Sequence, residues 1–119
     1  MRLNARVATI AASLIVLCIA AVPALAARSH AHATGVTVTA SEFKFKLSKA
    51  SVPAGPVTFS VTNKGKIPHD FKIAGKKTPL LQSGKTATLT VTLKKGKAAY
   101  LCTVSGHAAA GMKGTITVK

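Results

Sequence analysis

The chain has 119 residues, with 17 Lys and Arg against two acidic residues, and a formal net charge of +15 at pH 7. A chain of this length supports one domain with a modest core, which excludes a second domain. The charge bears on binding partners and not on the fold.

The first 26 residues have the features of a secretory signal peptide. Arg2 and Arg6 precede an apolar run over residues 7–22, and the small-residue cleavage pattern Ala24-Leu25-Ala26 follows. We therefore predict an exported protein, periplasmic or extracellular. An uncleaved run of this length could almost span a bilayer, so a retained membrane anchor is the alternative.

Residues 27–34 are small and polar without periodicity, and we interpret them as a flexible leader. If cleavage falls after Ala27, His30 becomes the third residue of the mature chain. There the amine, two amides and the imidazole can chelate Cu(II) or Ni(II). The alternative is that His30 and His32 are solvated residues of a disordered tail. Cleavage after Ala26 leaves 93 residues, with fifteen basic and two acidic side chains and a formal net charge of +13.

Residues 35–119 alternate apolar and polar side chains with a period of two, which is typical of half-buried strands. Turn-forming residues separate the alternating segments, and no segment has a sustained helical period. We expect an all-β antiparallel sandwich, with lysines beside Phe43 and Phe45 on a solvated face. The segment at residues 79–81 is left undetermined. The expected strands lie at residues 36–39, 43–48, 57–62, 71–73, 87–93, 98–101 and 116–118.

Cys102 is the only cysteine of the predicted mature chain, so an intramolecular disulfide is excluded. A lone exported thiol is oxidised or paired unless something protects it, and metal ligation would protect it. Cys102, His107 and Met112 have the spacing C-x4-H-x4-M, and His69 lies upstream. A thiolate, two imidazoles and a weak thioether are the ligands of a blue-copper site. The alternatives are an inert buried Cys, ordinary polar or core histidines and a Met that fills the core.

Two segments resemble the cupredoxins, the family of plastocyanin and azurin, with a ligand loop spaced as in rusticyanin and auracyanin. They are VTNKGKIPHDFKI at residues 61–73 and YLCTVSGHAAAGMKGTITV at residues 100–118. The resemblance implies a Greek-key β-sandwich with one type 1 copper ion near one end and a role as a mobile electron carrier. It also implies that His69, Cys102 and His107 are the equatorial copper ligands, that Met112 is the axial ligand, and that the electron leaves through His107 at the surface.

Asp70 departs from the pattern of the resembled family, in which plastocyanin and azurin have Asn after the first His ligand. We expect Asp70 to accept a hydrogen bond from Thr103 or from a backbone amide. An ionised carboxylate there would favour Cu(II) and lower the reduction potential, and a turn-capping Asp with no redox effect is the alternative.

We predict an exported blue-copper protein that carries one electron between redox partners, and not an enzyme, since no Ser-His-Asp set, paired acid or open three-His site is present. One alternative is a protein that buffers or delivers copper in the periplasm or extracellular space, and another is a metal-free adhesion module. We expect a monomer with acidic redox partners and, as a second option, an anionic membrane surface. Nucleic acid is excluded because no aromatic or helical reading element accompanies the lysines.

Overall fold

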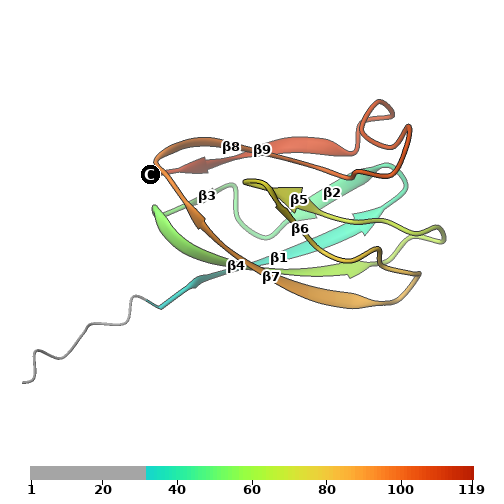
Figure 1. Ribbon diagram of the computed structural model, residues 1–119, viewed down its shortest axis with the longest axis horizontal. Helices are drawn as coiled ribbons and strands as arrows, with labels where there is room; N and C mark the ends of the chain where they lie inside the picture. Colours follow the sequence, from blue (N-terminus) through green and yellow to red (C-terminus); the bar gives the residue numbers. More distant parts are fainter. Residues whose placement is uncertain (1–31) are drawn as a thin grey trace, which may run out of the picture.

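The computed structural model describes residues 32–119, which form two β-sheets packed face to face (Figure 1). One sheet has the order β2-β1-β4-β7 and the other the order β3-β9-β8-β5-β6. The strands are β1 (Thr34–Ser41), β2 (Lys44–Leu47), β3 (Ser51–Val52), β4 (Gly55–Asn63), β5 (Lys72–Ile73), β6 (Lys76–Lys77), β7 (Thr86–Leu93), β8 (Gly96–Leu101) and β9 (Lys113–Val118).

The predicted signal peptide and residues 27–31 of the predicted leader, with His30, lie outside the described residues. β1 begins at Thr34, the last residue assigned to the leader. Between residues 32 and 119 there is no helix that is long and apolar enough to cross a bilayer.

The predicted all-β sandwich is confirmed, and most neighbouring strands pair in antiparallel fashion. Two pairs are parallel: β1 with β4, and β3 with β9. The first arises because the chain leaves the first sheet after β2, forms β3 in the second sheet and returns as β4 beside β1. The sheets are therefore mixed, a feature that local periodicity does not reveal.

The core lies between the sheets and follows the period of two along the strands. On β4, Val57, Phe59 and Val61 are fully buried, and they pack with Ile116 of β9 and with Phe71, which directly precedes β5. Burying each such side chain contributes about 1.5–3 kcal/mol to stability. On the outer face of β4, threonine side chains form hydrogen bonds to threonines of β7 at 2.9 Å. The apolar side chains of β4 are therefore buried on its inner face, and the threonines on its outer face form hydrogen bonds.

The expected position of Phe43 in a strand is wrong. Ser41 pairs with Lys44, so Glu42 and Phe43 form the two-residue turn between β1 and β2. Phe43 is 40% exposed, while Phe45 packs against the core and the lysines that flank Phe45 are exposed, as predicted. This turn lies at the same end of the sandwich as the loops after β4 and β8 (Figure 1). That end holds the candidate site.

Candidate metal centre

Cys102 lies directly after β8, where regular pairing of the strand stops. Its backbone N–H donates to the carbonyl of Met112 at 3.1 Å, and the residue is only 1% exposed. Burial raises the pKa of the Cys102 thiol above its ordinary value, because a thiolate is poorly solvated there. A metal ion that binds this sulfur must therefore displace a proton.

The loop between Cys102 and Met112 closes on itself through backbone hydrogen bonds. The N–H of His107 donates to Val104 at 3.1 Å, and the N–H of Met112 donates to His107 at 3.0 Å. Gly106 and Gly111 have φ values of 82° and 113°, which side chains on an L-residue disfavour. The two glycines let a short loop return Met112 to a position beside Cys102.

His69 lies between β4 and β5, on a segment held by backbone and side-chain hydrogen bonds. It forms an isolated antiparallel bridge with Leu81, in the segment that the sequence left undetermined. The buried Asn63 side chain donates to the carbonyls of Ile67 and Leu81, at 2.8 Å each, and accepts from the N–H of Gly65. The sequence marks Asn63 only as a turn residue. Its function as an anchor depends on contacts with Leu81, eighteen residues away.

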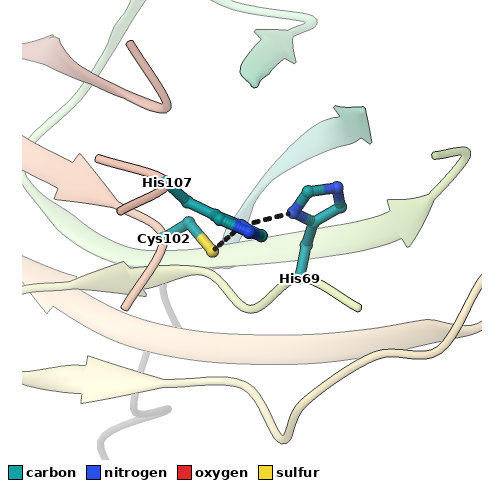
Figure 2. Close-up of side chains that lie close together, drawn as sticks. All are labelled: His69, Cys102 and His107. Carbon is teal, nitrogen blue, oxygen red and sulfur yellow. Dashed lines mark hydrogen bonds between the residues drawn. The ribbon is translucent and has the colours of Figure 1, made fainter. Parts of the chain in front are cut away.

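The side chains of His69, Cys102 and His107 converge from these two segments, as Figure 2 shows. The two Nδ1 atoms are 3.1 Å apart, and the Cys102 sulfur is 3.6 Å from Nδ1 of His107. Metal bonds of ~2.0–2.3 Å in a trigonal plane would separate such donor atoms by about 3.5–3.8 Å. The three residues are buried, their donor atoms lie within 4.8 Å of one another, and these two separations are within about 0.4 Å of those that one metal ion needs.

Met112 is fully buried and packs in one cluster with Cys102 and Ala40. Four residues singled out from the sequence therefore lie at one end of the sandwich, and three of them offer nitrogen or sulfur atoms within 4.8 Å of one another. This buried combination of two imidazoles and one thiol is compatible with type 1 copper.

Asp70 connects the two segments that carry the candidate ligands His69 and Cys102. One carboxylate oxygen accepts a hydrogen bond from the N–H of Thr103 at 2.6 Å, and the other accepts from the Thr103 hydroxyl. The predicted contact with Thr103 is confirmed, through both the hydroxyl and the amide. Because Asp70 follows His69 and Thr103 follows Cys102, this contact holds the two candidate ligands together.

The turn between β1 and β2 contacts both histidines, a contact that no sequence pattern indicates. The Glu42 carboxylate lies 3.2 Å from Nε2 of His69. The Phe43 ring packs edge to face against the His107 ring, with centroids 5.0 Å apart. Neither residue lies near a ligand in sequence, so no local signal could have identified them.

Comparisons with known proteins agree with this geometry. Residues 9–118 match the family of the cupredoxin-like domain, and the matched range begins inside the predicted signal peptide. The sodium-dithionite-reduced auracyanin of the photosynthetic bacterium Roseiflexus castenholzii is 22% identical, with a TM-score of 0.66 over 75% of this chain and 99% of that chain. Auracyanin B is 24% identical, with a TM-score of 0.65 over 73% of this chain and 89% of that chain. At these identities the two structures show a shared fold. No curated protein matches the sequence.

Proposed function

We propose that the chain, which belongs to the cupredoxin-like family, is an exported one-electron carrier. Members of this family are in general blue-copper electron carriers that act with redox partner proteins. The observation that supports this most strongly is the buried convergence of His69, Cys102 and His107 at one end of the sandwich. Bound copper would supply the one-electron chemistry, by alternating between Cu(II) and Cu(I).

We assign the Nδ1 atoms of His69 and His107 and the sulfur of Cys102 as the equatorial donors, and Met112 as the axial donor. The hydrogen bonds of Asp70 and Asn63 hold the two segments that carry His69 and Cys102. A donor set that is already in position needs little rearrangement when the oxidation state changes. Burial of the donors also favours a metal that is retained, as a carrier requires, over one that is exchanged for delivery.

His107 is our candidate for the site where the electron leaves. It is 8% exposed, more than the other three assigned ligands, which are at most 1% exposed. Residues 108–110 beside it are alanines, so a partner could approach closely. Phe43 covers one side of the ring, and we expect the partner to contact Phe43 as well.

An absorption spectrum tests the assignment of Cys102. Copper-loaded protein should be intensely blue, because of charge transfer from the thiolate to Cu(II), and should bleach reversibly with ascorbate. Cys102→Ser should remove the colour. A variant that stays blue would place the sulfur ligand elsewhere and overturn the proposed site.

Cyclic voltammetry tests the assignment of Met112. Met112→Gln should lower the reduction potential, since a harder oxygen donor favours Cu(II), while the three equatorial donors still bind copper. A potential equal to that of the unaltered protein would show that Met112 is not a ligand.

Export rests on residues 1–26 and is checked by the mature N-terminus. When the full chain is produced with an export system, the mature protein should begin at or near residue 27 and be found outside the cytoplasm. Retention of the first 26 residues in a membrane fraction would instead support the uncleaved anchor.

A further inference from the structure

Glu42 and Asp70 are the only acidic residues of the chain, and both contact the framework of the candidate metal centre. Asp70 joins the two ligand-bearing segments. Glu42 lies on a third segment, the turn between β1 and β2, and the proposed function gives it no role. The chain has 17 basic residues, so a basic neighbour would be available for this carboxylate, yet Glu42 contacts the candidate ligand His69.

One carboxylate oxygen of Glu42 accepts three hydrogen bonds. Two come from the backbone N–H groups of Lys66 and Ile67, at 2.7 and 3.0 Å, and the third partner is Nε2 of His69, at 3.2 Å. A carboxylate oxygen that accepts two backbone N–H groups is stabilised in its ionised form, so Glu42 is an anion at neutral pH.

The contact determines which nitrogen of His69 holds the proton. A carboxylate can only accept hydrogen bonds, so Nε2 must be the protonated nitrogen. In a neutral imidazole, Nδ1 then has a free lone pair. Nδ1 is the atom that lies 3.1 Å from Nδ1 of His107, on the side where the candidate ligands converge. Glu42 thus selects the tautomer of His69 that can bind a metal through Nδ1.

We propose that Glu42 is a positioning residue of the copper centre, which sets the tautomer of His69 and, through its negative charge, stabilises Cu(II) relative to Cu(I). This inference rests on the proposed function. A carboxylate that accepts from the outer nitrogen of a ligating His makes the imidazole a stronger donor, and a stronger nitrogen donor favours the more highly charged ion. The side chain of Glu42 is 33% exposed, so water screens part of the effect.

Gly65 provides the space that this arrangement needs. Its φ is not in the left-handed region, so backbone conformation alone does not require glycine. A Cβ atom at position 65 would instead collide with the carboxylate of Glu42. Gly65→Ala should therefore displace the carboxylate from His69 without changing its charge, which makes it an independent test of the contact.

The principal experiment measures the reduction potential of copper-loaded Glu42→Gln. Gln keeps an oxygen that can accept the same hydrogen bonds and removes the charge. We expect the affinity for Cu(II) to fall about tenfold relative to the affinity for Cu(I). For a one-electron couple this change raises the reduction potential by about 59 mV. The blue absorption should be retained. Thr92→Lys is the control, since it adds one positive charge at an exposed position. Thr92 pairs with Pro56 at the start of β4, whereas the candidate metal centre lies beyond the other end of that strand. A potential for Glu42→Gln that equals that of Thr92→Lys would overturn the redox part of the proposal.

A second experiment reads the tautomer of His69 in the metal-free protein by nitrogen-15 NMR. In the unaltered protein the proton should lie on Nε2, and in Glu42→Ala and Gly65→Ala a mixture of tautomers should appear. An unchanged tautomer in both variants would reduce Glu42 to an anchor of the Lys66 and Ile67 amides and overturn the positioning role. If the unaltered protein binds copper without turning blue, the proposed function fails, whereas the NMR result still decides whether Glu42 sets the tautomer.

Discussion

Asp70 shows how a single side chain can hold two distant segments at a fixed separation. Its carboxylate accepts from both the amide and the hydroxyl of Thr103, which is 33 residues away in sequence. Hydrogen bonds to a charged acceptor contribute about 1.5–3 kcal/mol each when buried. The same negative charge lies beside the candidate copper ligand His69, so Asp70 has a structural role and an expected redox role.

Substitution of Asp70 separates these roles. Asp70→Asn keeps an oxygen for the Thr103 amide and removes the charge, so we expect a higher reduction potential with little loss of stability. Asp70→Ala removes both hydrogen bonds and should lower the free energy of unfolding by about 3–6 kcal/mol. Voltammetry and urea denaturation measure the two effects. An unchanged potential in Asp70→Asn would leave Asp70 with the structural role alone.

At the scale of elements, β8 and β9 link the core to the ligand loop. Tyr100 on β8 pairs with Gly114 on β9, and its ring lies over Gly114 while it packs against Phe45 and Phe71. Gly114 lies within a strand without a positive φ, and it leaves room for the Tyr100 ring.

Two Gly→Ala substitutions in strands test this account. Gly114→Ala must displace the Tyr100 ring and should destabilise the protein by about 1–3 kcal/mol. Gly35→Ala in β1 meets no atom within 4 Å and should be neutral or stabilise by up to about 1 kcal/mol. Urea denaturation of the two variants measures the difference. Equal stabilities would show that the ring moves aside without cost.

At the scale of the whole molecule, the described residues combine fourteen lysines with the two acidic residues, and both acids are engaged at the candidate metal centre. The surface is therefore strongly positive. A field of this kind attracts anionic partners from a distance and increases the rate of encounter. Lysines on exposed strands also reduce edge-to-edge aggregation, so charge alone does not demonstrate steering.

Oxidation of the reduced protein by small metal complexes of opposite charge tests steering directly. Between ~0.01 M and ~0.15 M salt the Debye length falls from about 30 Å to about 8 Å. The rate with an anionic complex should fall roughly tenfold or more over this range, and the rate with a cationic complex should rise. Stopped-flow rates that do not vary with salt for either complex would assign the lysines to solubility alone.

The all-β architecture and the group of candidate ligands could be predicted from local sequence. A period of two marks strands wherever one face is buried, as on β4, because successive side chains point to opposite faces. The spacing of Cys102, His107 and Met112 is equally local, since one short loop contains all three. His69 was added through chemistry and family resemblance, because a trigonal site needs a second imidazole from elsewhere in the chain.

Tertiary structure alone decided the contacts that surround these candidate ligands. The parallel pairing of β1 with β4, the hydrogen bonds of Glu42 and Asn63 and the packing of Phe43 on His107 all join segments that are distant in sequence. Which segments meet depends on strand order and register across both sheets, and these follow from packing the whole core. The amino-acid sequence therefore predicted the candidate donors from their chemistry, while the packing of the sandwich determined which residues hold and contact them.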